Sequence, residues 1–191
     1  KNIKGELVCK NPFPSMPLKF WNDKNEKKFK DAYFNRFLNA WHHGDFAEIK
    51  KTNGLIIHGR SDTTLNPGGV RLGTAEIYSE VERFKEVKES IVVGQSWDND
   101  VRIILFIVMN TKFYLTEDLL KKIKLQIKKN ASPRHVPSKI IQVKDIPRTK
   151  SGKIVELAVK NILDGNNIKN KEALANPEAL KQFKNLKELS N

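Results

Sequence analysis

The sequence has little of what marks secreted or membrane proteins. Its 191 residues include one cysteine, Cys9, which excludes an internal disulfide and fits a reducing cytoplasm. No apolar run approaches the roughly 20 residues that a membrane-spanning helix needs. The first four residues contain neither an initiator methionine nor the apolar stretch of a signal peptide. These absences favour a cytoplasmic chain with no membrane partner.

The composition is that of a soluble globular protein, with 39% hydrophobic and 30% charged residues. A net charge of +13 raises the hypothesis of a nucleic-acid partner. However, Lys and Arg are spread along the chain, and aromatic residues do not alternate with them as on a base-stacking surface. The lysines between positions 121 and 129 fall near the end of a predicted helix, where cations complement the helix dipole. We therefore expect non-specific affinity for polyanions and no specific nucleic acid.

The first 61 residues read as a β-rich segment that buries little. Strands are predicted at residues 5–9, 46–49 and 55–58, the last two joined by the turn 52–54. Three prolines between positions 12 and 17 indicate a loop, and a short helix is predicted near residues 25–35. These elements alone would form a poor core. We therefore expect residues 1–61 to be the end of a larger N-terminal domain.

Residues 62–165 carry a self-sufficient α+β pattern. The expected fold is a roughly three-stranded sheet packed by helices, with a two-stranded hairpin around residues 66–69. Residues 101–109 are almost all apolar, which predicts a central strand buried on both faces. Thr74 is the expected N-cap of a helix with Ile77 and Val81 inward, and Leu120, Ile123 and Ile127 are the expected core face of the next helix. Residues 166–191 are expected to form a helical extension opening near Pro177.

One stretch, residues 147–153, concentrates cations and hydroxyls in a loop between a strand and a helix. Its sequence is Pro-Arg-Thr-Lys-Ser-Gly-Lys. The strand is predicted at residues 140–143, and the helix after it presents Ile154, Leu157, Ala158 and Ile162, with Gly165 as its C-terminal cap. Such a loop suits an anionic ligand. A solvated turn in a lysine-rich chain would look similar, so the loop alone leaves both interpretations open.

A second stretch, residues 59–77, combines with the first into an ordered set of motifs. It contains Gly-Arg-x-Asp at residues 59–62 and a Gly-x-Arg hairpin at 69–71, followed by a helix with Glu-Ile. With Pro-x-Thr-x-Ser-Gly-Lys, this order resembles the C-terminal signatures of the adenylate-forming superfamily of acyl-CoA synthetases. Residues 65–71, 132–137, 155–160 and 173–178 are most similar to those of the acetoacetyl-CoA synthetases.

The resemblance implies a two-step reaction. ATP and a carboxylate give an acyl-adenylate and pyrophosphate, a hinge then turns, and CoA forms the thioester. Lys153 matches the catalytic lysine of adenylation, where an ammonium offsets the repulsion between carboxylate and α-phosphate. Asp62 matches the hinge residue, although a simple turn former is the alternative.

The nucleotide side of the resemblance rests on Asp45 and Arg60. Asp45 matches an aspartate that accepts hydrogen bonds from the AMP ribose, and Arg60 matches an arginine that contacts ribose or phosphate. His43 stands where the family usually has threonine, and a structural salt bridge is the alternative role for either charged residue. The adjacent His42 and His43 should point to opposite faces of a strand, which disfavours a metal site.

The CoA side of the resemblance rests on the hairpin. Gly69 and Arg71 match the segment that enters the active site for thioester formation, where glycine permits a close backbone approach. Arg71 could pair with a CoA phosphate or tie the hairpin to the body of the enzyme. Lys128 and Arg134 are weaker candidates for a CoA phosphate, because a solvated face explains them equally well.

The superfamily's phosphate loop, its adenine and Mg²⁺ segment and its acyl pocket are absent from the sequence. The resemblance therefore implies a C-terminal fragment of an ATP-dependent acetoacetate–CoA ligase, inactive without its N-terminal adenylation domain. ATP, CoA and Mg²⁺ would serve the full-length parent, with no Mg²⁺ site in this chain. Two alternatives stay open: a C-terminal domain of an acetyl- or propionyl-type synthetase, and a basic module that binds anions.

Overall fold

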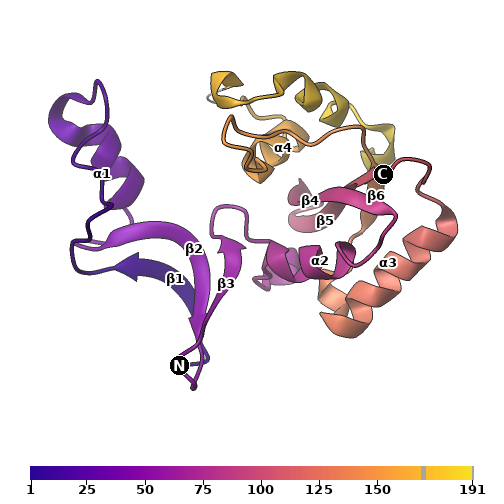
Figure 1. Cartoon of the computed structure of the whole chain (residues 1–191), viewed down its shortest axis with the longest axis horizontal. Coiled ribbons are helices and arrows are strands. Elements are labelled where there is room, and N and C mark those ends of the chain that lie inside the picture. The colour runs from indigo at the N-terminus through magenta and orange to yellow at the C-terminus, as the bar shows by residue number, and fades with distance from the viewer. Residues whose placement is uncertain (169–170, 191) are drawn as a thin grey trace. The chain divides into compact units, whose positions relative to one another are not determined.

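The chain divides into two compact units that are described separately. A computed structural model describes residues 1–168 and 171–190; unit 1 is Lys1–Asp62 and unit 2 is Thr63–Asn191 (Figure 1). Each unit has one three-stranded sheet, which confirms the predicted α+β class. Positions 169, 170 and 191 of the predicted C-terminal extension lie outside the described residues. Among the described residues, no helix combines the length and hydrophobicity needed to span a bilayer.

Unit 1 is an antiparallel sheet in the order β1-β2-β3. Its strands are β1 (Lys4–Cys9), β2 (Trp41–Ile49) and β3 (Leu55–Arg60). The three predicted strands are confirmed, although β2 begins at Trp41, earlier than expected. In the turn between β2 and β3, the Lys50 amide donates to the Gly54 carbonyl at 2.8 Å, and Asn53 has a φ of 66°.

The rest of unit 1 is a proline-containing loop and the helix α1 (Lys27–Tyr33), preceded by the 3-10 turn Lys24–Glu26. The ring of Tyr33 stacks on Trp41 with centroids 3.7 Å apart. By contrast, the side chains of Leu18, Trp21 and Leu38 are 94%, 94% and 90% exposed. Unit 1 therefore displays large apolar side chains that a self-contained domain would bury.

Unit 2 is organised around β5. Its sheet has the order β4-β5-β6, with β4 (Val87–Trp97) antiparallel and β6 (Lys139–Gln142) parallel to β5 (Asp100–Met109). Residues 103–108 of β5 are all buried, which confirms the prediction of a central strand. Asp98 and Asn99, both with positive φ, form the turn between β4 and β5.

Helices cover both faces of this sheet (Figure 1). α2 (Thr74–Val81) and α3 (Glu117–Asn130) pack on one face, and α4 (Glu156–Leu163) packs on the other with the 3-10 helices Pro177–Phe183 and Lys187–Leu189. Alternate residues of β5 supply the two cores, with Leu105 in the first and Phe106 in the second. This alternation follows from the two-residue period of a strand.

Two expectations about the start of unit 2 need correction. Thr74 is the first residue of α2 and not its N-cap: Gly73 holds the extended cap position, and Thr74 is 4% exposed. The predicted two-stranded hairpin is a single antiparallel bridge between Leu65 and Leu72, around the 3-10 turn Pro67–Gly69. The proline and the tight turn leave too few residues for a longer ladder.

The buried faces of two helices differ from the prediction by one or two residues. In α3 the buried stripe is Leu119, Ile123 and Ile127, while Leu120 is only partly buried. Thr116 caps this helix, accepting from the Leu119 amide at 3.3 Å. Leu119 is on the side of α3 that packs against the sheet, in the same core as Leu105.

In α4 the buried residues are Ala158 and Val159, whereas Ile154 and Leu157 are 36% and 41% exposed. The helix begins only at Glu156, so Ile154 precedes it. Gly165, at a φ of 72°, follows the last turn as predicted. The helix expected near Pro177 is a 3-10 helix.

Tyr78 joins α2, β4 and α4 through its hydroxyl group. The hydroxyl donates to Glu156 Oε1 at 2.5 Å and accepts from the Val92 amide at 3.0 Å. Burial, together with the neighbouring Glu156 carboxylate, raises the pKa of Tyr78 well above its usual range.

Replacing Tyr78 with phenylalanine should lower the free energy of unfolding by about 1–3 kcal/mol, because the amide and the carboxylate lose their partner. The raised pKa favours the neutral phenol in the fold. The contribution of Tyr78 to the free energy of unfolding is therefore fully present below a pH of about 10 and is lost at higher pH. Urea unfolding at several pH values measures both effects. Tyr114, which is 75% exposed, gives the control Tyr114→Phe, and equal effects of both variants would contradict the account.

Candidate active-site residues

The loop that ends at Lys153 is a closed turn. Arg148 and Ile154 form an antiparallel bridge, and inside it the Thr149 amide donates to the Lys153 carbonyl at 2.8 Å. The Lys153 amide donates to Thr149 Oγ1 at 3.1 Å. Gly152 completes the turn at a φ of 84°, a conformation that suits glycine. The loop lies between β6 and α4, as predicted, and its own hydrogen bonds fix the backbone of Lys153.

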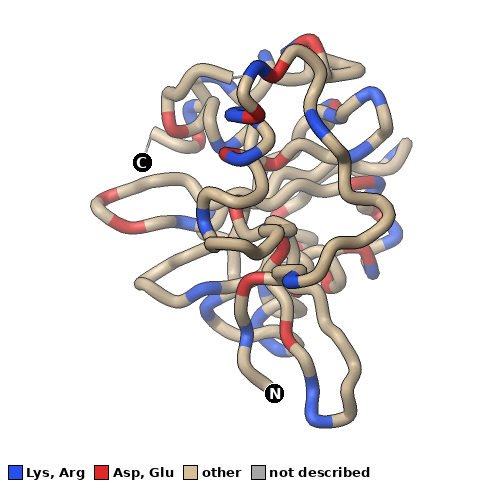
Figure 2. Tube along the Cα trace, turned by 90° about the vertical axis from the view of Figure 1, so that its left-hand side faces the viewer, with Lys and Arg blue, Asp and Glu red and all other residues tan. Residues whose placement is uncertain are grey.

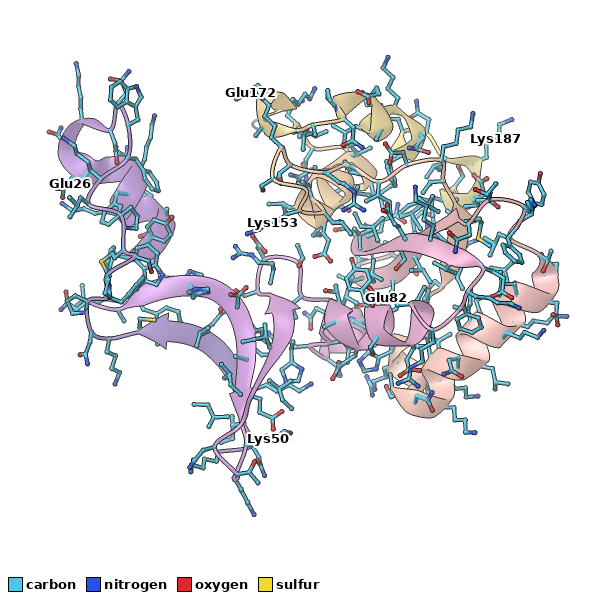
Figure 3. All side chains as sticks on the ribbon, viewed as in Figure 1. Glu26, Lys50, Glu82, Lys153, Glu172 and Lys187 are labelled. Atoms are coloured by element: carbon cyan, nitrogen blue, oxygen red, sulfur yellow. The ribbon has the colours of Figure 1, made fainter. Side chains whose placement is uncertain are left out.

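The Lys153 side chain is exposed and lies at the periphery of unit 2 (Figure 3). Within residues 1–168 and 171–190, no carboxylate lies within ion-pair distance of its ammonium. Lys160, further along the chain, is instead held at 3.0 Å by Asp164. An ammonium on a fixed backbone can reach an anionic ligand without first breaking an ion pair.

Arg148 has a different role from that expected of a loop cation. Its guanidinium donates to the Gly152 carbonyl at 3.0 Å and pairs with Glu89 at 2.7 Å. The Arg148 side chain therefore stabilises the turn and links it to Glu89. The pairing partner lies on β4, far away in sequence, so composition gave no signal of it.

A cavity of about 430 Å³ borders this loop, between Arg148 and Ile154 on one side and Tyr78 and Ser90 on the other. Ser90 is 5% exposed, and its hydroxyl has no hydrogen-bond partner among the described residues. The cavity is next to the loop, but Lys153 is not among its lining residues.

Three of the predicted site residues meet in unit 1. Asp45 on β2 and Arg60 on β3 are direct cross-strand partners. Arg60 Nη1 lies 3.7 Å from Asp45 Oδ1, and Arg60 Nη2 lies 3.3 Å from Asp62 Oδ2. The arginine thus stands between two carboxylates. Its own side chain is 52% exposed and that of Asp62 is 46% exposed, whereas Asp45 is 20% exposed.

Gly44 makes this arrangement possible. A Cβ atom at Gly44 would lie 2.7 Å from Arg60 Nη2 and 2.8 Å from Nη1. The glycine also has a φ of 84°. The guanidinium therefore crosses directly over the Gly44 backbone, and donates to the His43 carbonyl at 3.3 Å.

The two adjacent histidines have separate partners. His42 Nε2 lies 3.2 Å from Glu6, while His43 Nδ1 lies 2.5 Å from Asp45 Oδ2. His43 thus contacts the carboxylate that the sequence singled out. Across the part of the chain that the structure describes, no group of three or more His, Cys, Asp or Glu could hold a metal ion.

The remaining predicted residues lie in unit 2. Gly69, with a φ of 76°, is at the exposed tip of the 3-10 turn, and Arg71 follows it. Arg134 approaches this turn, because a Cβ at Gly68 would lie 3.7 Å from its Nη1. Lys128 is exposed in the last turn of α3. The structure brings Arg134 to the turn, whereas Lys128 belongs to another element, α3.

Sequence reasoning missed a buried contact behind these residues. His135, 7% exposed, has Nε2 2.7 Å from Glu76 Oε2 and Nδ1 2.8 Å from Ser132 Oγ. It ties the first turn of α2 to the segment after α3. A histidine three residues after a serine was the only local signal, and its partner Glu76 is distant in sequence.

Positive charge is distributed over many elements. Figure 2 shows Lys and Arg along most of the chain, interspersed with Asp and Glu. This distribution gives no support to the alternative of a dedicated polyanion-binding module.

Comparison with known proteins adds an independent observation. Residues 76–153 match the family model of the AMP-binding enzyme C-terminal domain. The chain is 60% identical to the acetoacetyl-coenzyme A synthetase of Rhizobium meliloti (strain 1021) over 188 residues, 98% of this chain and 29% of the relative. The chain is homologous to the C-terminal portion of acetoacetyl-CoA synthetases.

Other relatives agree. The acetoacetyl-CoA synthetase of Xenopus tropicalis is 49% identical over 98% of this chain and 28% of its own length. The structure of the Streptomyces lividans acetoacetyl-CoA synthetase has a TM-score of 0.88 at 39% identity, covering 95% of this chain and 28% of that one. The chain therefore spans less than a third of the synthetases it matches. The match to the AMP-binding C-terminal domain ends at Lys153, the residue that the sequence motif singled out.

Proposed function

We propose that this chain is the C-terminal portion of an AMP-forming acetoacetate–CoA ligase. The parent would convert acetoacetate, ATP and CoA into acetoacetyl-CoA through an acetoacetyl-adenylate. The observation that carries this proposal is the 60% identity over 98% of the chain to an acetoacetyl-coenzyme A synthetase. Because the chain covers 29% of that relative, the activity is assigned to the parent, and the fragment alone should be inactive.

Lys153 would act in adenylation. The attacking carboxylate and the α-phosphate are both anions, so their approach is unfavourable without a cation between them. The exposed Lys153 ammonium on a hydrogen-bonded turn can supply that cation. A preorganised charge aimed at the developing transition state is among the largest effects available to an enzyme.

Asp45 and Arg60 would hold the nucleotide. Asp45 offers a partly exposed carboxylate, which can accept hydrogen bonds from the two ribose hydroxyls. Arg60 lies 3.7 Å from it and can turn a donor toward a phosphate or the ribose. The His43 contact to Asp45 Oδ2 would orient the carboxylate.

Asp62 would be the hinge between two parts of the parent. In this assignment residues 1–61 end the large adenylation domain, 62–165 form the mobile domain that carries Lys153, and 166–191 are a C-terminal extension. The division of the chain into units after Asp62 supports it. The Asp62–Arg60 pair is largely exposed, and exposed pairs are weak enough to open during a rotation.

Gly69 and Arg71 would serve thioester formation, with Arg134 and Lys128 as further cations for CoA phosphates. Gly69 has no side chain, and its positive φ favours glycine at this position, so the turn tip would leave room for the pantetheine of CoA. Arg134 approaches the same turn.

The other groups that the reaction needs would come from the rest of the parent protein. The N-terminal portion would contact the exposed apolar residues of unit 1 and supply the acyl pocket and the Mg²⁺ ligands. A cytoplasmic location is consistent with Cys9, which is a free thiol.

An acid panel tests the proposed function. Full-length parent protein is given ATP, Mg²⁺ and CoA with acetoacetate, acetate or propionate, and pyrophosphate release is measured. We expect the highest kcat/KM with acetoacetate. A preference for acetate or propionate would favour another short-chain synthetase, and no pyrophosphate with any acid would contradict ligase activity.

A further inference from the structure

The segment after α4 is fixed to unit 2 by buried side chains. Phe183 is 1% exposed and meets Phe106 of β5 edge to face, with ring centroids 4.9 Å apart. Leu180 and Leu189 are also buried, at 4% and 6%. The segment 171–190, here called the C-terminal strap, is thus a packed part of the unit. It lies beyond residues 76–153, which the domain model matches.

The strap pairs with the loop that carries Lys153. Thr149 and Leu174 form an antiparallel bridge. The Lys150 amide donates to the Ala173 carbonyl at 3.1 Å, and the Ala175 amide donates to the Arg148 carbonyl at 2.8 Å. One edge of the loop is therefore closed by its own turn, and the other by the strap.

Asn176 fastens the beginning of the same loop. Its Oδ1 accepts from the Arg148 amide at 2.8 Å, and its Nδ2 donates to Asp145 Oδ2 at 2.6 Å and to the Ile146 carbonyl at 2.9 Å. A single carboxamide thus satisfies three groups on residues 145–148. The distances to Arg148 and Ile146 are those of ordinary hydrogen bonds, and the one to the charged Asp145 is slightly shorter.

Gln182 makes similar contacts to the residues just before this loop. Its Oε1 accepts from the Lys144 amide at 2.7 Å, and its Nε2 donates to the Asp145 carbonyl at 2.8 Å. The strap therefore follows the approach to the loop from Lys144 to Lys150. Such continuous pairing restricts the loop much more than a single contact would.

These contacts lead to the backbone of Lys153. Asn176 holds Arg148, the next residue Thr149 hydrogen-bonds to Lys153 through both its amide and its hydroxyl, and Lys153 makes no ion pair in the described residues. The strap therefore helps to fix the position of the Lys153 backbone, from which the exposed side chain extends. Small displacements of a reacting group cost large factors in rate.

We propose that Asn176 is a positioning residue that holds the Lys153 loop for adenylation. The proposal rests on the proposed function of Lys153. It assigns to the C-terminal strap a part in the first half-reaction, with no part in thioester formation from an adenylate already made.

The test compares Asn176→Ala with wild type in the full-length parent. We expect kcat for acetoacetate-dependent pyrophosphate release to fall between about tenfold and 10²-fold. The KM for ATP and thioester formation from preformed acetoacetyl-adenylate should stay near wild type. Lys181→Ala, an exposed change on the same 3-10 helix, is the control. Gln182→Ala, further from Lys153, should have a smaller effect of the same kind.

Hydrogen exchange of residues 147–153 is measured on the same proteins. Asn176→Ala should accelerate exchange at the Arg148 and Lys150 amides, and this readout does not need ligase activity. Unchanged exchange, or an equal loss of both half-reactions, would overturn the proposal, as would a low melting temperature that accounts for the whole loss. If wild type releases no pyrophosphate with any acid, the proposed function fails, while the exchange result still decides whether Asn176 holds the loop.

Discussion

Replacing Lys153 with alanine in the full-length parent should reduce acetoacetate-dependent pyrophosphate release by about 10²–10³-fold. The ammonium is the group that offsets repulsion between carboxylate and α-phosphate in our account, and the variant leaves the turn otherwise intact. Thioester formation from preformed acetoacetyl-adenylate should be close to wild type, because the phosphoryl chemistry is then complete. Both half-reactions are measured in the same preparation.

The matched control is Lys150→Ala. Lys150 is exposed on the same loop, and its contact with the strap uses only its backbone amide. This variant removes the same charge three residues away and should keep most of the adenylation rate. If the two variants lose equal activity, the general charge of the loop matters and the specific position of Lys153 does not.

Replacing Gly44 with valine should raise the KM for ATP at least about tenfold. A Cβ there would lie 2.7 Å from the Arg60 guanidinium, so the arginine must leave Asp45. A branched residue at a φ of 84° adds backbone strain. A lost hydrogen bond to a charged group is worth about 1.5–3 kcal/mol, or about 10–10²-fold in affinity. Steady-state kinetics with varied ATP measure it.

Gly5→Val in β1 is the control for that change. A Cβ at Gly5 would meet no atom within 4 Å. This variant should keep the wild-type KM for ATP. Thermal melts of both proteins separate a folding defect from a binding defect. An unchanged KM in Gly44→Val would contradict the assignment of Asp45 and Arg60 to the nucleotide.

Much of unit 2 could be predicted because its signals are local. The apolar run at residues 101–109 identified the central strand, and the spacing of Ile123 and Ile127 identified two residues of the buried face of α3. Pro147 and Gly152 placed the Lys153 turn between β6 and α4. Each depends on backbone preferences of residues close in sequence, which composition and periodicity report directly.

The rest depends on contacts between distant residues. Glu89 on β4 engages Arg148, Glu76 on α2 engages His135, and Asn176 holds residues 145–148. The local sequence around each of these residues does not indicate its partner. The choice of Leu119 over Leu120 has the same origin, because the packed sheet selects which side of the helix is buried. The motifs indicated candidate site residues, and the fold shows which contacts hold them.

The central claim is that the parent forms an acyl-adenylate from acetoacetate and ATP, and that Lys153 is needed for this step. The most direct measurement is mass spectrometry of the enzyme after incubation with acetoacetate, ATP and Mg²⁺ without CoA. The account predicts bound acetoacetyl-AMP and free pyrophosphate for wild type and for Lys150→Ala, and only traces for Lys153→Ala. ADP as the product, or equal acetoacetyl-AMP in all three proteins, would contradict it.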